Sequence, residues 1–231
     1  MRIGIVSAFG KESKPLRSKL PESRREVIDD LVFFLHRYEN TEVVVVKTGP
    51  GQECGAKGTE LLIGHYGPQV IINCGVAGAI APPRQIGDVV ISDRVITFSE
   101  AEGDWSNEGY SFAHPELLLT ALQTAAGFHP KVNVTAGTIL SGNDVICSLE
   151  KRESLWVRFR GQCVEQEGAS VARVCQSHHL PWIIIRGISD RADEHLLHDF
   201  KKNVEQAALH SALVTFDLLK QLSTYSSFGS Q

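Results

Sequence analysis

The sequence predicts an α/β fold in a single domain, with a buried β-sheet covered by helices. Apolar, β-branched runs recur along the chain, and segments with helical spacing lie between them. No repeat, linker or low-complexity block divides the 231 residues. We therefore expect one domain over residues 1–222 and a Ser-rich, disordered tail over residues 223–231.

The first quarter of the chain begins with a short apolar strand at residues 3–8. Glu12 follows the carboxyl end of that strand, where open α/β sheets place their ligands. Glu12 is also explained as an acid in the first turn of the next helix, stabilised by the helix dipole. Residues 26–36 carry apolar side chains four positions apart, which predicts an amphipathic helix. Three further elements are expected in order: a strand at 42–47, a helix at 54–65 and a strand at 70–73.

A glycine-rich segment, CGVAGAI, occupies residues 74–80. Glycines at such a place let the backbone approach a ligand closely and expose its N–H groups. A dinucleotide fingerprint needs GxGxxG at the start of a helix, followed by an acid on the next strand, and this segment lacks that pattern. It continues to a strand at 88–92, so we expect a loop that forms a wall between two strands.

The middle of the chain contains a polar and aromatic stretch at residues 98–112. We expect a loop there, which closes a pocket, meets a partner subunit or lies in solvent. The elements expected after it are a helix at 114–126, a strand at 132–140 and a short amphipathic helix at 149–159.

Residues 163–193 organise the predicted site. Two acids, Glu165 and Glu167, precede a run of small residues that begins a helix packed closely on the sheet. Pro181 disfavours helix at the residue before it, and residues 182–185 then form an apolar run typical of a strand buried on both faces.

Arg186 closes this predicted strand, and a loop at residues 187–190 ends in Asp190. Two acidic loops should therefore meet on one side of the sheet. The last helix, at residues 205–222, repeats apolar side chains at helical spacing and should cover the sheet.

Composition narrows the function classes. A net charge of −4 with scattered basic residues argues against a nucleic-acid partner. The apolar runs are too short to span a bilayer, and Met1 leads directly into a strand, so we expect a cytoplasmic protein. The five cysteines have no CxxC spacing and read as reduced, mostly buried thiols. No His, Asp and Glu cluster has ligand spacing, so we expect no metal and no cofactor.

Four separated segments carry a resemblance to a known family. MRIGIVSAFGKE, NCGVAGAI with GDVVISD, VEQEGASVARVC and IIIRGISDRAD resemble the purine nucleoside phosphorylase and nucleosidase superfamily, in the right order over nearly the full chain. Within it the sequence is most similar to the methylthioadenosine/S-adenosylhomocysteine nucleosidases. The resemblance implies a nucleoside phosphorylase-like fold with a mixed, twisted central sheet, a homodimer, and cleavage of the N-glycosidic bond of a purine nucleoside.

The resemblance also implies catalytic roles for individual residues. Asp190 of the ISD motif would be the general acid that protonates the purine N7. Glu12 would be the base that activates water, and Arg186 would lie beside that water. Glu167 would hold the ribose 2′- and 3′-hydroxyls.

Further residues are implied to bind the substrate. The backbone of Val145 and Ile146, after SGND, would read the purine edge, and Phe200 would close over the base. The remaining residues expected to line the pocket are Val76, Ala77, Gly78 and Gln166.

These residue types suit the chemistry. Glycoside cleavage passes through an oxocarbenium-like state, which requires a proton donor to the leaving group and carboxylates near the cationic sugar. Asp190 must be protonated when it acts, which in a closed pocket requires a raised pKa. A carboxylate such as Glu167 can make short, charge-assisted hydrogen bonds to two vicinal hydroxyls.

The co-substrate is the next question. Phosphorylases of the superfamily carry an arginine just before the glycine-rich segment to bind phosphate, and Asn73 occupies that place here. Uncharged Asn73 favours water as the nucleophile. Arg84 and Arg94 remain candidate phosphate ligands, which keeps a phosphate-dependent phosphorylase as an alternative.

Two departures from the nucleosidase pattern bear on the substrate. Val76 stands where a small hydroxyl residue usually helps to place the water, and Gln166 stands where a methionine usually lies under the ribose. Gln166 adds a polar group that can meet the sugar or a 5′ substituent. A futalosine-type nucleoside and a non-catalytic nucleoside-binding protein are therefore further alternatives, although Asp190 favours a 6-aminopurine.

Overall fold

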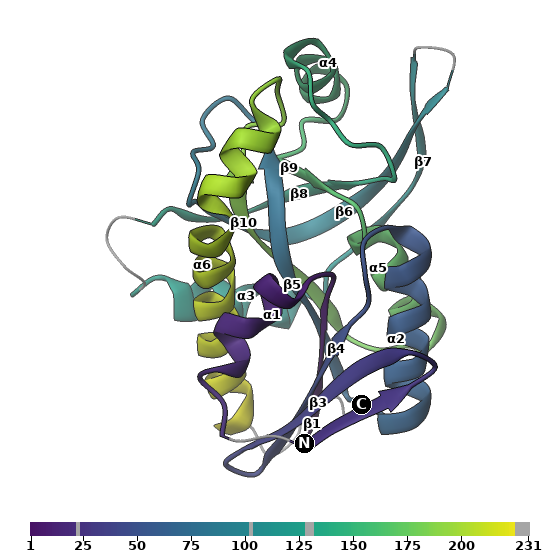
Figure 1. Ribbon diagram of the computed structural model, residues 1–231, viewed down its shortest axis with the longest axis vertical. Helices are drawn as coiled ribbons and strands as arrows, with labels where there is room; N and C mark the ends of the chain where they lie inside the picture. The colour runs from purple at the N-terminus through teal and green to yellow at the C-terminus, as the bar shows by residue number, and fades with distance from the viewer. Residues whose placement is uncertain (22–23, 102–103, 128–131, 225–231) are drawn as a thin grey trace.

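The computed structural model of the chain describes residues 1–21, 24–101, 104–127 and 132–224. It confirms an α/β domain with a mixed central sheet flanked by helices (Figure 1). Of the expected tail, residues 223–224 end the last helix, and residues 225–231 lie outside the described part.

The described strands form one ten-stranded sheet in the order β10-β6-β8-β9-β5-β1-β4-β3-β2, with β7 paired to β6. Because β10 also pairs with β5, the strands β5, β9, β8, β6 and β10 close a ring. The strand bounds are β1 Arg2–Ser7, β2 Arg24–Ile28, β3 Leu31–Tyr38, β4 Thr41–Lys47, β5 Val70–Ala79, β6 Val89–Ala101, β7 Asp104–Phe112, β8 Val134–Ser141, β9 Cys163–Glu165 and β10 Trp182–Asp190.

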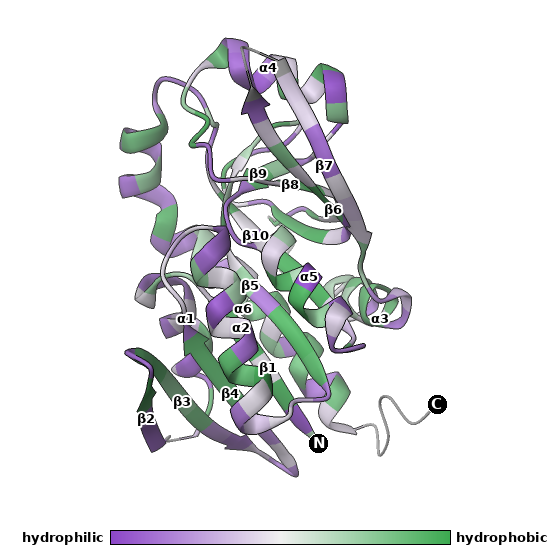
Figure 2. Cartoon of the chain, turned by 90° about the vertical axis from the view of Figure 1, so that its right-hand side faces the viewer, coloured by the Kyte–Doolittle hydropathy of each residue, from purple (hydrophilic) through white to green (hydrophobic). Residues whose placement is uncertain are grey.

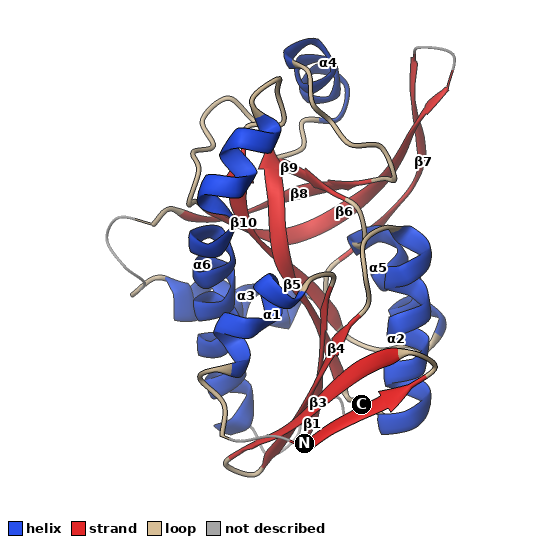
Figure 3. Ribbon diagram, viewed as in Figure 1, coloured by secondary structure: helices blue, strands red, loops and turns tan. Residues whose placement is uncertain are grey.

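Helices cover both faces of the sheet, with α1, α3 and α6 on one side and α2 and α5 on the other (Figure 3). Helix α4 lies across the end of the molecule at which β6 and β7 project. The helix bounds are α1 Gly10–Arg17, α2 Gln52–Tyr66, α3 Pro115–Ala125, α4 Leu149–Phe159, α5 Gly168–Ser177 and α6 Leu196–Thr224. None of these helices is both long and apolar enough to cross a membrane.

Parallel strands at the centre explain the continuous apolar runs of the sequence. β1, β4, β5 and β10 run parallel to one another, and β10 is buried along its whole length. Figure 2 shows β4 as a largely hydrophobic ribbon. A strand that is covered on both faces needs apolar side chains at successive positions, so periodicity alone could not assign an inner and an outer face.

The helix expected over residues 26–36 is wrong. The structure has the β2–β3 hairpin there, in which Val27 pairs with Val32 and Ile28 with Leu31. Asp29 and Asp30 form the two-residue turn with φ angles of 46° and 66°. Positive φ at both turn positions matches the right-handed twist of the paired strands, and aspartate tolerates it better than most residues do. The apolar side chains spaced four positions apart therefore belong to two paired strands and not to one helix.

Three expected loops are also strands. Of the expected loop at residues 98–112, residues 98–101 end β6 and residues 104–112 form β7, and residues 102–103 lie outside the described part. Trp105 is buried edge-on against Phe98 at a ring distance of 5.4 Å. The glycine-rich segment continues β5 as far as Ala79, and β10 continues past Arg186 to Asp190. These last two strands pair with each other, with Gly187 beside Val76, which explains why neither segment is a loop.

The other expected elements are present, with shifted ends. Helix α6 begins at Leu196, before the expected residue 205, and so carries Phe200. Strand β8 ends at Ser141, and α5 ends before His178 as the Pro181 signal predicted.

Candidate active site

A cavity of about 270 Å³ lies where β1, β5, β9 and β10 end and α6 begins. The structure brings together every sequence-predicted site residue except Arg186 in its lining. The residues that line it are Phe9, Glu12, Val76, Ala77, Gly78, Asp144, Val145, Ile146, Val164, Glu165, Gln166, Glu167, Ser189, Asp190, Ala192, Leu196, Leu197 and Phe200.

Glu12 is both an acid in the first turn of a helix and an acid of the cavity, the two interpretations that the sequence allows. It lies in the first turn of α1, where its Oε2 accepts the Phe9 N–H at 2.9 Å, and it also lines the cavity. Its Oε1 accepts the Val76 N–H at 2.9 Å. Burial raises the pKa of Glu12, although the Arg186 charge and these backbone N–H groups oppose that rise. A buried carboxylate with a raised pKa is suited to accept a proton near neutral pH.

Asp190 ends β10 at an irregularity in its pairing with β5, where it lies opposite Gly78. Its Oδ2 accepts the Ser189 hydroxyl at 2.8 Å, and its Oδ1 accepts the Ala192 N–H at 2.9 Å. Burial raises the pKa of Asp190, and the negative charges of Asp199 and Asp193 add to that rise. The carboxyl group is therefore oriented from both sides and favours its protonated form more than an exposed aspartate does.

Glu167 stands at the start of α5 and lines the same cavity. Its Oε1 accepts the Gly51 N–H at 2.8 Å, where α2 begins. Burial raises the pKa of Glu167 to about 8, and the neighbouring charge of Glu165 contributes. The second oxygen, Oε2, lies 3.9 Å from the Arg186 guanidinium.

Arg186 lies behind the cavity wall and is 1% exposed. Its Nη2 contacts Glu165 Oε2 and Asn73 Oδ1, each at 2.5 Å. Burial lowers the pKa of the guanidinium, but the charges of Glu165, Glu167 and Glu12 outweigh that effect and raise it above its ordinary value. Arg186 is therefore a fixed positive charge among these carboxylates.

The glycines of β5 have a different use from the one expected. A Cβ atom on Gly75 would lie 2.6 Å from Glu12 Oε1, and a Cβ atom on Gly78 would lie 2.7 Å from Asp190 Oδ1. Both distances are shorter than van der Waals contact, so each glycine leaves room for one carboxylate. The segment thus places the two acids against one strand.

Gln166 ties two walls of the cavity together. Its Nε2 donates to the Asn143 carbonyl at 2.9 Å, and its own carbonyl accepts from Gln52 Nε2 at 2.7 Å. Asn143 directly precedes Asp144, Val145 and Ile146 in the lining. The amide expected to meet the sugar or a 5′ group thus also positions the segment expected to read the base.

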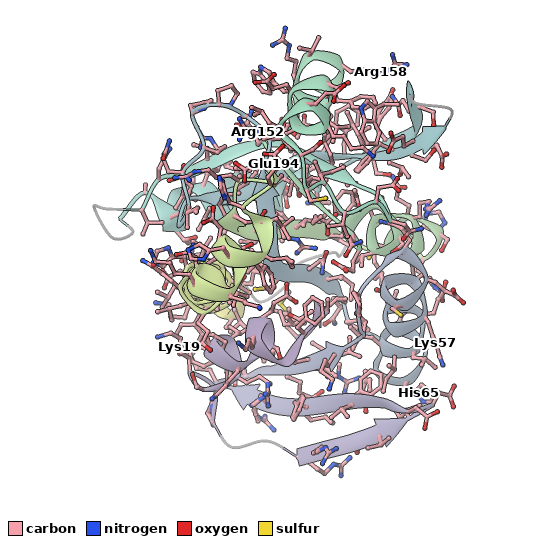
Figure 4. All side chains as sticks on the ribbon, turned by 45° about the horizontal axis from the view of Figure 1, so that its top comes forward. Lys19, Lys57, His65, Arg152, Arg158 and Glu194 are labelled. Atoms are coloured by element: carbon pink, nitrogen blue, oxygen red, sulfur yellow. The ribbon has the colours of Figure 1, made fainter. Side chains whose placement is uncertain are left out.

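The segment between Asp190 and Phe200 is anchored to α4. Arg152 Nη1 donates to the Arg191 carbonyl at 3.3 Å, and Glu194 Oε1 accepts the Leu149 N–H at 3.0 Å. Figure 4 shows Arg152 and Glu194 close together above the centre of the molecule. These contacts tie residues 191–194, which follow Asp190, to the first turn of α4.

The two arginines considered as phosphate ligands lie elsewhere. Arg84 donates to Thr135 Oγ1 and Arg94 to Thr138 Oγ1, each at 2.8 Å, and neither residue lines the cavity. Asn73 is engaged on both sides of its amide, with Nδ2 on the Val6 carbonyl at 2.9 Å and Oδ1 on Arg186. Within the described ranges, no group of three or more His, Cys, Asp and Glu side chains could hold a metal ion.

Comparison with known proteins identifies the family of the chain. A family model described as the phosphorylase superfamily matches residues 2–220. The chain belongs to this superfamily. Among similar superfamily members, a 5′-methylthioadenosine/S-adenosylhomocysteine nucleosidase of Bacillus subtilis (strain 168) is 32% identical over 230 residues, covering 96% of this chain and 100% of the relative.

Two solved superfamily structures from Helicobacter pylori are similar throughout. A futalosine hydrolase has a TM-score of 0.88 and 27% identity, covering 96% of this chain and 98% of its own. A mutant methylthioadenosine/S-adenosylhomocysteine nucleosidase, with 5′-methylthioadenosine in its active site, has a TM-score of 0.88 and 26% identity, covering 95% and 98%.

Several lining residues of this superfamily member were not predicted from its sequence. Ser189 stands inside the ISD motif, and its contact with Asp190 follows from adjacency alone. Phe9 and Leu197 are 42% and 72% exposed although apolar, and they lie beside predicted site elements. Their position next to predicted site residues could have indicated that they line the cavity. Sequence spacing alone does not say which apolar side chains turn toward a cavity.

Proposed function

We propose that this chain hydrolyses the N-glycosidic bond of an adenine nucleoside, such as 5′-methylthioadenosine or S-adenosylhomocysteine, and releases adenine. The observation that carries the proposal is the convergence of Glu12, Glu167 and Asp190 on one cavity, from three separate parts of the chain. The nucleosidases and futalosine hydrolase to which the chain is similar support it.

The proposed mechanism divides the reaction among these acids. Asp190 donates its proton to the leaving purine, so that the bond breaks toward an oxocarbenium-like sugar. Glu12 takes a proton from the attacking water, and Arg186 holds positive charge behind it. Glu167 accepts hydrogen bonds from the ribose hydroxyls. The backbone at Val145 and Ile146 reads the base.

Other walls of the cavity complete the proposed substrate site. Phe200 packs beside Val76 and would close over the base. Ala77 and Gly78 lie on β5 and line the cavity, and Gln166 would border the ribose. The apolar residues Phe9, Leu196 and Leu197 leave the mouth suited to an apolar 5′ substituent.

The charge of the cavity supports water over phosphate as the nucleophile. The lining contains the acids Glu12, Asp144, Glu165, Glu167 and Asp190, and none of the described lining residues is a lysine or arginine. A phosphate dianion entering such a wall would be repelled. Arg186 Nη2 also donates a hydrogen bond to Asn73, so that this nitrogen is already engaged within the protein and not available to a phosphate.

A second candidate, hydrolysis of a futalosine-type nucleoside, rests on the similarity to the Helicobacter pylori futalosine hydrolase. The deciding experiment is chromatography of free bases released from methylthioadenosine, S-adenosylhomocysteine, adenosine, inosine and an aminofutalosine-type nucleoside, with and without phosphate. We expect adenine release that does not need phosphate. Release only with phosphate would make the chain a phosphorylase, and ligand binding without any base release would make it a nucleoside-binding protein.

We also propose that the chain forms a homodimer. Tyr110 and Phe112 on β7 are 61% and 62% exposed, and their rings contact each other at 5.4 Å. Exposed aromatic pairs are frequent in protein interfaces. Light scattering after gel filtration should give the mass of two chains, and a Tyr110→Ser, Phe112→Ser double variant should give one. A wild-type monomer at micromolar concentration would contradict the proposal.

The proposed location is the cytoplasm. Cys74, Cys163 and Cys175 are buried free thiols, and burial raises the pKa of each. Unpaired thiols are typical of proteins from reducing compartments, where disulfides are rare.

A further inference from the structure

Glu165 has no role in the proposed mechanism, yet it is the acid most strongly bound by the protein around the cavity. It ends β9, is 6% exposed, and accepts hydrogen bonds from three other residues. These are the Glu167 N–H at 3.1 Å, the Gly168 N–H at 2.9 Å to each oxygen, and Arg186 Nη2 at 2.5 Å. All of these partners are donors, which is the arrangement that an ionised carboxylate needs.

Two of these bonds set the position of Glu167. The N–H groups of Glu167 and Gly168 belong to the start of α5, where a helix leaves its first N–H groups without internal partners. Gly168 is closely fitted, because a Cβ there would lie 2.8 Å from Glu165 Oε1 and 2.7 Å from Ile184 Cδ1. The Glu165 carboxylate therefore fixes the turn from which Glu167 faces the cavity.

The remaining bond engages Arg186, a cation that also lies near Glu12 and Glu167. Arg186 binds Glu165 at 2.5 Å but lies 3.9 Å from Glu167 Oε2. Arg186 Nη1 and Glu12 Oε1 both lie against Gly75, because a Cβ there would be 3.3 Å from the first and 2.6 Å from the second. Arg186 is thus close to all three acids, and its short contact is with Glu165, the one that has no role in the proposed mechanism.

The charges in this cluster do not balance. Glu12 from α1, Glu165 and Glu167 from the β9–α5 corner, and Arg186 from β10 interact electrostatically, and Cys74 of β5 adjoins them. Three ionised carboxylates beside one guanidinium would leave two uncompensated negative charges in a buried site. Burial raises the pKa of Glu12, and raises that of Glu167 to about 8, so protonation relieves this excess.

We propose that Glu165 is a positioning residue of the reaction, which engages the Arg186 guanidinium and the first turn of α5 and so controls how Glu167 faces the cavity and how strongly Arg186 can pair with Glu12 and Glu167. The inference rests on the proposed function for its kinetic readout. It assigns to Glu165 an influence on the charge of Glu12 and Glu167, which are the groups proposed to meet water and ribose, exerted through Arg186 and the α5 turn.

The test is the pH profile of kcat/KM for Glu165→Gln. Without the Glu165 charge, Glu167 loses a like charge that raises its pKa, and Arg186 is left to compensate only Glu12 and Glu167, so that both should ionise at lower pH. The acidic limb of the profile should therefore move to lower pH by about one unit, the lower end of the effect of an adjacent opposite charge. Glu165→Asp keeps the charge and should keep the wild-type limb even if kcat falls.

Glu60→Gln is the matched control, because Glu60 is half-exposed on α2 and pairs with His178 at the surface. It should leave both the limb and the rate unchanged. Lower activity of Glu165→Gln with an unmoved limb would reduce Glu165 to a structural role and overturn the proposal.

A second measurement needs no Glu165 variant and no turnover. In a ¹³C NMR titration of the wild-type protein labelled at glutamate Cδ, a glutamate resonance should titrate above pH 7 and disappear in Glu167→Gln. If all glutamates are fully ionised by pH 6, the proposal fails even where the nucleosidase activity is present. If the titration is seen but no nucleoside is cleaved, the proposed function fails and the charge arrangement stands.

Discussion

Asp190→Asn should lower kcat for adenine release by about 10³-fold, within the range that general acid catalysis contributes. Asparagine has the shape of aspartate, and its carbonyl can still accept the Ala192 N–H that now binds Oδ1. It has no acidic proton to give to the leaving purine. The loss should therefore appear in kcat, measured by single-turnover base release, while adenosine still raises the melting temperature.

Asp217→Asn supplies the control for this substitution. Asp217 lies on α6 and pairs with Lys220 at 2.5 Å, at a site that does not line the cavity. It should retain full activity. Wild-type turnover by Asp190→Asn would remove Asp190 as the proton donor and leave the cavity without an assigned acid.

Gly187→Ala should destabilise the fold by about 3 kcal/mol, the upper end of the usual cost of overpacking. A Cβ atom at this position of β10 would lie 2.0 Å from the Ala207 carbonyl oxygen and 2.7 Å from the Ala207 carbonyl carbon of α6. Both clashing atoms belong to backbone, so no side-chain rotation relieves them. Urea unfolding should reveal a lower midpoint.

The same substitution elsewhere should act in the opposite direction. Gly64 lies in α2, and a Cβ there would have no neighbouring atom within 4 Å. Gly64→Ala should stabilise the protein by about 0.5–1 kcal/mol, because alanine loses less backbone entropy in a helix. An unchanged midpoint for Gly187→Ala would mean that α6 can move away from β10 at little cost.

The sequence predicted those parts of the fold whose signals are local. The apolar and β-branched runs predicted β1, β4 and β8, and Pro181 predicted that α5 ends before it. The family motifs identified residues that do line one cavity, including Glu12 and Asp190.

What the sequence missed depends on contacts between distant segments. β5 and β10 remain strands through glycine-rich or polar residues because each is the other's partner. Gly75 and Gly78 are needed by carboxylates that come from other elements. Glu165 was visible as one of two neighbouring acids, but its commitment to Arg186 is a property of the folded site. Spacing alone carries none of this information.

The closed ring of strands also limits how copies of the chain can aggregate. Within the described ranges, only β2 and β7 pair with a single neighbouring strand, so these two are the edge strands of the sheet. β2 carries Arg24, Arg25 and Glu26, whose charges oppose the addition of a further strand. The β6–β7 pairing is interrupted between Thr97 and Phe98, and such irregularities twist an edge away from flat stacking. The molecule thus protects both edges against fibre-like growth and leaves association to its side chains.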